Sequence, residues 1–153
     1  MRTADDGVSS YGRDHQNPTN RSIHWVCVPA ILWSVVAALW TIPVPGATWP
    51  GFWCWVAIAA ALAFYFRLSR PLGVAMLGLF LLLGALTSAL HASLGPSRLL
   101  GAAVEVFVVA WIGQFIGHKF EGRKPSFLTD LAYLMVGPAW LMSKLMRRAG
   151  LAY

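Results

Sequence analysis

Three long stretches of the chain carry almost no charged residue, and short polar breaks separate them. Residues 22–66 and 71–97 contain no Asp, Glu, Lys or Arg, and residues 99–118 contain only Glu105. A helix needs about 20 apolar residues to cross the hydrocarbon of a bilayer. The first stretch is long enough for two crossings. The sequence PVPG after Ile42 ends any helix there, so it separates the first crossing from the second. The pattern therefore predicts an all-α integral membrane protein.

We expect four transmembrane helices, at about residues 23–42, 49–66, 71–92 and 99–118, after a polar N-terminal segment of residues 1–17. A further apolar stretch, residues 127–145, is interrupted by Gly137-Pro138 and contains Lys144. A fifth crossing there would carry Lys144, Arg147 and Arg148 outside, against the positive-inside rule. We therefore expect a re-entrant or interfacial helical hairpin, within one membrane domain that covers residues 1–153.

Composition supports a membrane protein and sets its orientation. Hydrophobic residues make up 58% of the chain and charged residues 12%, against about 25% charged residues in a soluble domain. The net charge of +6 comes from cations at the ends of the apolar stretches, which suits lipid headgroups and argues against nucleic acid as a partner. Since these cations precede the first span, follow the second and follow the fourth, both termini are expected in the cytoplasm. The first 22 residues lack the apolar core of a signal peptide, so no cleavage is expected.

Three of the four histidines fall at the predicted cytoplasmic ends of spans. Asn17-Pro18 is typical of a helix N-cap followed by the first helical position, so His24 lies on the second turn of the first helix and His15 lies just before it. His118 ends the fourth span. His91 ends the third span on the opposite face, about 30 Å away, and is left out of the site.

These side chains form a plausible metal-ligand set. Gln114, His118 and Glu121 are spaced by four and three and share one helix face. Histidines with a carboxylate bind first-row transition metals, and two His with one carboxylate are typical of non-haem Fe(II) oxygenases. We therefore predict a site for a first-row transition metal at His15, His24, His118 and, as ligand or as orienting group, Glu121, with the three histidines as the catalytic residues. Hydrogen-bond partners or substrate contacts are expected from Tyr11, Asn17, Asn20 and Gln114.

Other metal designs do not fit the composition. A ferritin-like di-iron site needs four carboxylates from bundle helices, and this chain has six acidic residues, of which Asp5, Asp6 and Asp14 precede the first helix. Four histidines are too few for the clustered histidine boxes of membrane desaturases. The sequence also lacks an HExxH motif, a Gly-rich phosphate loop and a Ser nucleophile elbow.

Two segments, YGRDHQNPTNRSIHWVCVP and WIGQFIGHKFEGRKPSFLTDLAYLMVGP, resemble a family of small membrane dioxygenases found in bacteria and fungi that act on 2-hydroxy fatty acids. The residues that carry the resemblance are Tyr11, His15, Asn17, Asn20, His24, Pro29, Gln114, Gly117, His118, Glu121 and Pro125. Cys27 departs from the pattern, in which a glycine is expected. The resemblance implies Fe(II)-dependent cleavage of the C1–C2 bond with O2, which gives a product one carbon shorter in fatty acid alpha-oxidation.

The resemblance also implies how the substrate is held. A 2-hydroxy acid would chelate Fe(II) through its carboxylate and hydroxyl, and its acyl tail would lie among the spans. The cations that would attract the carboxylate are Arg13, Arg21, Lys119, Arg123 and Lys124. For a bacterial member, the expected location is the inner membrane with a cytoplasmic active site. Chain length, head group, the number of iron atoms and homo-oligomer formation stay open.

Two alternatives remain from the residues themselves. One is a b-type haem protein with His24 and His118 as axial ligands. The other is a non-catalytic membrane scaffold or lipid-binding protein, in which the polar residues serve only the membrane interface.

Overall fold

The computed structural model describes residues 17–44, 46, 49–121 and 135–151, and every regular element within these ranges is helical. The expected all-α fold is confirmed for this part of the chain. The helices are α2 (Pro18–Trp40), α3 (Phe52–Leu68), α4 (Arg70–Leu94), α5 (Pro96–Glu121) and α7 (Val136–Arg148).

Each of the four predicted spans corresponds to one helix. Three helices are long and apolar enough to cross a membrane, namely α2, α4 and residues 96–120 of α5. Helix α3 is apolar but has 17 residues, which is at the short end of the range for a crossing. Helix α2 begins at Pro18 with Asn17 as its N-cap, as predicted, and therefore starts before the apolar run of the first span.

Polar caps and glycines set the helix ends. The Ser69 hydroxyl accepts a hydrogen bond from the Leu72 N–H at 3.4 Å, so one residue both ends α3 and starts α4. Gly51 precedes α3 with φ +86°, and a Cβ there would lie 2.8 Å from the Trp40 ring. Only glycine satisfies both the positive φ and this close approach.

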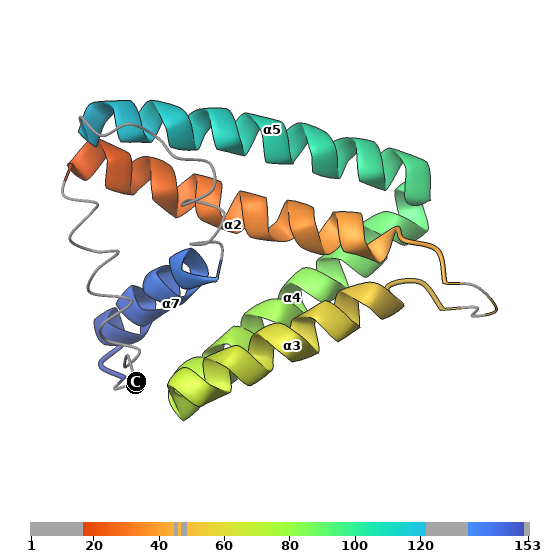
Figure 1. The fold of residues 1–153 in the computed structure, drawn as a ribbon, viewed down its shortest axis with the longest axis horizontal. Coiled ribbons are helices and arrows are strands. Elements are labelled where there is room, and N and C mark those ends of the chain that lie inside the picture. The colour runs from red at the N-terminus through yellow and green to blue at the C-terminus, as the bar shows by residue number, and fades with distance from the viewer. Residues whose placement is uncertain (1–16, 45, 47–48, 122–134, 152–153) are drawn as a thin grey trace.

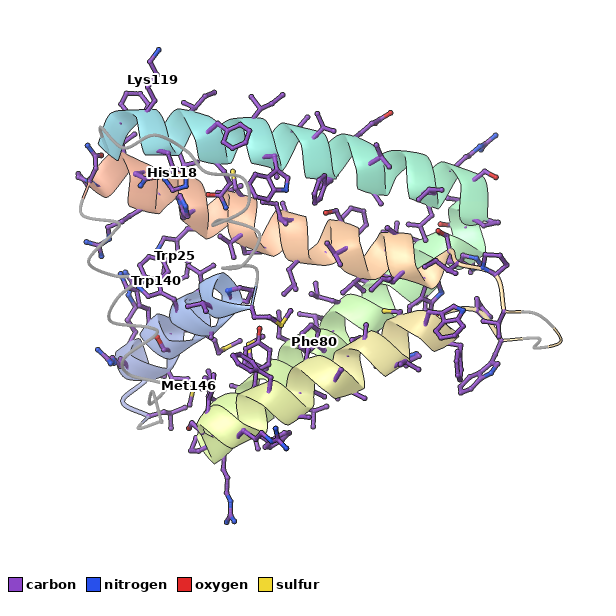
Figure 2. The ribbon with its side chains drawn as sticks, viewed as in Figure 1. Trp25, Phe80, His118, Lys119, Trp140 and Met146 are labelled. Atoms are coloured by element: carbon purple, nitrogen blue, oxygen red, sulfur yellow. The ribbon has the colours of Figure 1, made fainter. Side chains whose placement is uncertain are left out.

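The helices form two antiparallel pairs that diverge from one end of the molecule (Figure 1). Helices α2 and α5 lie side by side along their length, and α3 and α4 form the second pair. The pairs are close together near the end of α2 and separate toward its start, where α7 occupies the space between them. The main apolar cluster joins α2, α3 and α4 to Ala139 and Met146 of α7; Figure 2 shows Met146 and Phe80 on the sides of the two elements that face each other.

The predicted hairpin differs from the structure in one detail, the place of Gly137-Pro138 in α7. Residues 127–134 lie outside the described part of the chain, and α7 covers the rest with 13 residues, about 20 Å, which is too short to cross a bilayer. Gly137-Pro138 was expected to interrupt the helix but lies in its first turn. Proline is tolerated there because first-turn N–H groups have no acceptor within the helix. The start of α7 is held by the buried Tyr65, whose hydroxyl donates to the Met135 carbonyl at 2.8 Å.

Candidate metal centre

His24 of α2 and His118 of α5 lie side by side at the open end of the molecule. Their ring centroids are 5.3 Å apart and the ring planes meet at 86°. His24 is buried, with 1% of its surface exposed, and His118 is half-buried; Figure 2 shows His118 between the ribbons of α2 and α5. Two of the predicted ligands, from distant parts of the sequence, are therefore neighbours in space.

A backbone hydrogen bond fixes the ring of His24. Its Nδ1 lies 2.9 Å from the carbonyl oxygen of Asn20, one turn earlier on α2. Because a carbonyl only accepts, Nδ1 carries the proton and the lone pair of the neutral ring lies on Nε2. This is the arrangement by which metal-binding histidines are usually oriented.

Two glycines let α5 approach α2 beside the imidazoles. A Cβ on Gly117 would lie 2.5 Å from Oδ1 of Asn20, and a Cβ on Gly113 would lie 2.7 Å from Sγ of Cys27. The GxxxG pair noted in the sequence thus contacts α2, as small-residue motifs in membrane helices commonly do. Any larger residue at 117 would push the two helices, and the two imidazoles, apart.

Asn17 ties the helix ends together. Its side-chain oxygen accepts hydrogen bonds from the N–H groups of Thr19 and Asn20, at 2.9 and 3.3 Å. Its amide nitrogen donates to the carbonyl oxygen of Phe120 at 3.1 Å. The sequence predicted the cap but not this second bond, which holds the start of α2 against the end of α5.

Buried amide groups surround the imidazoles. Asn20 is fully buried and Gln114, one turn before His118, has 8% of its surface exposed. Within the described ranges, Oε1 of Gln114 has no hydrogen-bond partner. A buried acceptor without a donor is costly, so this oxygen indicates that a further polar group completes the site.

The remaining predicted site residues fall in several places. Tyr11, His15 and Arg123 lie outside the described residues, as do Arg13 and Lys124. Glu121 is the last residue of α5, but its side chain is not described. Consequently, no group of three or more His, Cys, Asp or Glu side chains occurs in the part of the chain that the structure covers.

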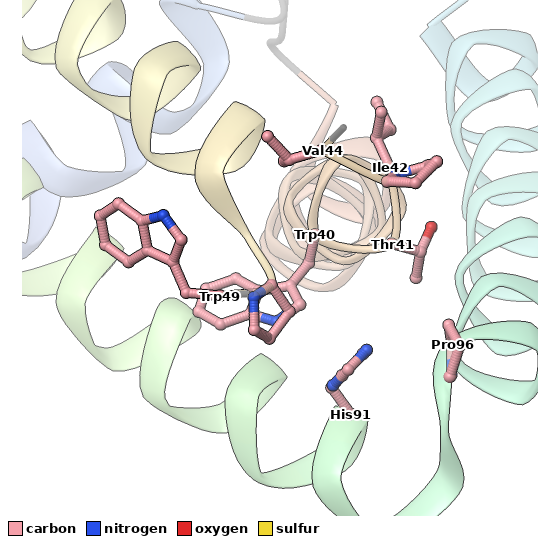
Figure 3. A pocket seen from close by; sticks show the side chains of 9 residues that line it. Trp40, Thr41, Ile42, Val44, Trp49, His91 and Pro96 are labelled. Atoms are coloured by element: carbon pink, nitrogen blue, oxygen red, sulfur yellow. The ribbon is translucent and has the colours of Figure 1, made fainter. Parts of the chain in front are cut away.

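His91 lies at the far end of α4, away from the imidazole pair. It lines a cavity of about 380 Å³ together with Trp40, Trp49 and the turn that follows α2 (Figure 3). Its exclusion from the predicted site agrees with this position.

Arg21 was expected among the cations near the site, but the contacts of the cations on α7 with tryptophan rings were not predicted. Nζ of Lys144 lies 3.9 Å from the ring centroid of Trp140, and Cζ of Arg148 lies 5.4 Å from that of Trp25, the residue after His24. Burial, followed by the charges of Arg21, Arg148 and Arg147, lowers the pKa of Lys144. Residues 140, 144 and 148 repeat at one helical turn, and this spacing was the signal available in the sequence.

The separation of the imidazoles suits two ligands of one ion. Imidazoles bound through nitrogens at about 2.1 Å place their ring centroids roughly 4.5–5.5 Å apart, and the observed value is 5.3 Å. The axial ligands of a haem lie on opposite faces of the macrocycle. Because α2 and α5 are in contact at Gly117, a haem could not lie between these rings without moving the two helices apart.

Comparison with known proteins agrees with the predicted resemblance. A family described as "2-hydroxy-palmitic acid dioxygenase Mpo1-like" matches residues 1–149. The chain belongs to this Mpo1-like family. It is similar to 2-hydroxy-palmitic acid dioxygenase MPO1 of Saccharomyces cerevisiae, with 29% identity over 143 residues that cover 89% of this chain and 75% of the yeast protein. No solved structure matches the chain.

Membership of the Mpo1-like family and the name of the yeast relative point to dioxygenase activity on 2-hydroxy fatty acids. The apolar helices indicate association with a membrane. An Mpo1-like chain with two imidazoles in contact at one end of its helices has groups suited to this chemistry.

Proposed function

We propose that this Mpo1-like chain is an Fe(II)-dependent membrane dioxygenase that cleaves 2-hydroxy fatty acids between C1 and C2, as in fatty acid alpha-oxidation. The observation that carries the proposal is the contact between His24 and His118, with Nδ1 of His24 directed to a backbone carbonyl. His15 and Glu121 are proposed to complete the ligand set. In a balanced form that needs no reductant, the acid and O2 give the acid one carbon shorter, CO2 and water; the C1–C2 bond breaks and four electrons pass to O2.

Fe(II) would supply the redox chemistry with O2 that side chains lack. The chain's own residues would orient the ligands and the substrate and enclose the site. The Asn20 carbonyl keeps the His24 lone pair on Nε2, and Oε1 of Gln114 is suited to accept a hydrogen bond from the substrate's 2-hydroxyl group. Asn17 and Gly117 hold the two helices at the spacing that these roles require.

The cations beside the site are suited to attract the substrate carboxylate. The charges of Arg21 and Arg148 act on Lys144, and Arg148 lies over Trp25, the residue that follows His24 in α2. Charges of one sign in a partly dry site raise the local concentration of an oppositely charged substrate. Among the five cations expected from the resemblance, Arg21 belongs to this group.

An apolar groove between α2 and α3, with a volume of about 50 Å³, could hold only the end of the acyl tail. It is lined on α2 by residues such as Leu32 and Leu39 and on α3 by Ala57 and Ala61. Leu32 follows His24 by two turns of α2, about 12 Å along the helix. A tail that starts at the imidazole pair would reach this groove, and each buried methylene would contribute about 0.8 kcal/mol.

The test is metal content and substrate-dependent O2 uptake of anaerobically purified protein. We expect bound iron, and O2 uptake with 2-hydroxypalmitate but not with palmitate. His24→Ala and His118→Ala should each lose iron and at least about 100-fold in activity, as losses of metal-site groups commonly do. His91→Ala is the matched control, because His91 lies at the other end of the molecule; it should retain both.

The alternatives predict different results. A haem protein would show an intense Soret band, which a non-haem ferrous site lacks. A scaffold or lipid-binding protein would contain no metal and would keep its fold and lipid binding after both substitutions. Full activity in either histidine variant, with helical content unchanged by circular dichroism, would exclude the proposed site.

A further inference from the structure

A carboxyl group is exposed near the middle of an apolar helix. Glu105 follows Pro96 by nine residues in α5, which has 26 residues, so it lies about 5 Å from the helix midpoint along the axis. Residues 96–120 form one of the candidate membrane spans. Glu105 is exposed, so its side chain is directed toward the region that lipid tails would fill, not toward the bundle.

The face of α5 that carries Glu105 is turned away from α2. Leu99, Ala103 and Ala110 are buried in clusters with residues of α2, and Glu105 lies on the opposite side of the helix by the 3.6-residue period. Neighbours on its own face include Val108 and Ile112, with 49% and 52% of their surfaces exposed. No hydrogen bond or ion pair links Glu105 to any residue within the described ranges.

An ionisable group in this position calls for a polar partner from outside the bundle. Ionisable residues inside a membrane are costly and almost always face a bundle interior, a water-filled cavity or a polar partner. The first two environments do not apply to an exposed residue on the outer face of α5. The described part of the chain supplies no such partner, so the source that remains is another molecule within the membrane.

The surface around Glu105 admits a second helix at close range. A Cβ on Gly101, one turn earlier on the same face, would meet no atom within 4 Å, so this position presents bare backbone to an approaching helix. Small residues at such places allow membrane helices to pack closely and form hydrogen bonds across the interface.

We propose that two copies of the chain associate through this face of α5, with the two Glu105 carboxyl groups hydrogen-bonded to each other. Copies inserted into one membrane share one orientation, so the symmetry axis of the pair runs along the membrane normal. Equivalent residues then lie at equal depth, and Glu105 meets Glu105. A carboxylic acid group has both a donor and an acceptor, so two identical groups satisfy each other without any cation.

The test measures the dimer fraction of full-length protein in phosphatidylcholine vesicles over a range of protein-to-lipid ratios, by single-molecule photobleaching. Glu105→Leu removes the polar pair, and we expect it to raise the dissociation constant about 10-fold. Glu105→Gln retains a donor and an acceptor and should dimerise like the parent. Ser88→Leu, the same polar-to-leucine change on the exposed face of α4, is the matched control and should change nothing.

Cross-linking locates the interface. In a variant with Cys27 and Cys54 replaced by serine, Val108→Cys should form a disulfide-linked dimer on oxidation, and Leu82→Cys, exposed on α4, should not. A protein that is monomeric at every ratio would overturn the proposal. So would a dimer that is unaffected by Glu105→Leu, or one lost equally in Glu105→Gln. Since neither assay uses substrate or iron, these results are independent of the proposed activity.

Discussion

At the scale of single residues, the distance between the two imidazoles depends on a few atoms that are not ligands. The absent side chain of Gly117 leaves the space that Oδ1 of Asn20 occupies, and the Asn20 carbonyl in turn holds Nδ1 of His24. The lack of a side chain at Gly117 therefore affects, through Asn20, the orientation of the proposed ligand His24.

Gly117→Ala should destabilise the protein by about 1–3 kcal/mol, because the new methyl group cannot fit without moving a fully buried asparagine. Gly113→Ala should cost less, since its methyl group would meet the end of the Cys27 side chain. Gly78→Ala on α4, where nothing lies within 4 Å, is the matched control and should be neutral or slightly stabilising. Unfolding in mixed detergent micelles gives the ranking, and equal stability of the three variants would contradict it.

At the scale of elements, runs with few or no charges predicted the helices because charged side chains are costly in the hydrocarbon and therefore rare in membrane helices. The N-cap at Asn17 was also predictable, since it depends on neighbouring residues only. The partner of the GxxxG face, the second bond of Asn17 to Phe120 and the position of α7 were not. These depend on which helices become neighbours, and hydrophobic runs of similar character do not specify their partners.

Helix α7 places Lys144 beside other cations, and the titration of the Lys144 ammonium group should show their effect. Burial first, and then the charges of Arg21, Arg148 and Arg147, lower the pKa of Lys144. The ammonium group therefore loses its proton at a lower pH than an ordinary lysine, and the reactive neutral amine is present earlier as pH rises. Acetylation of Lys144, followed by mass spectrometry against pH, should show a midpoint below that of the unfolded protein.

Substitution of a neighbouring cation tests the cause of this shift. Arg21→Gln should move the labelling midpoint of Lys144 upward, because one repulsive charge is gone. Arg70→Gln, at the start of α4 and outside the group that acts on Lys144, is the control. If both substitutions left the midpoint unchanged, α2 and α7 would not meet as described.

At the scale of the whole molecule, the two ends differ in chemistry. One end carries the imidazole pair, the buried amides and the cations of α7. The other carries the turn after α2, with Trp40, Trp49 and His91 around a cavity. Tryptophan is common at membrane interfaces and excess Lys and Arg mark the cytoplasmic side, so the polarity of the molecule predicts its orientation.

Single cysteines in a variant with Cys27→Ser and Cys54→Ser would establish that orientation. Ser22 at the start of α2 and Ala149 after α7 are exposed at one end, and Ser97 at the start of α5 is exposed at the other. With an impermeant maleimide, Ser97→Cys should react in intact bacterial spheroplasts, whereas Ser22→Cys and Ala149→Cys should react only in inverted vesicles. Because the four predicted crossings would return the chain to its starting side and α7 is too short to add a fifth, labelling of Ala149→Cys together with Ser97→Cys would refute this topology. That labelling result would also place the cations of α7 on the other side of the membrane from the imidazole pair. The proposed role of these cations in attracting the substrate carboxylate would then be wrong.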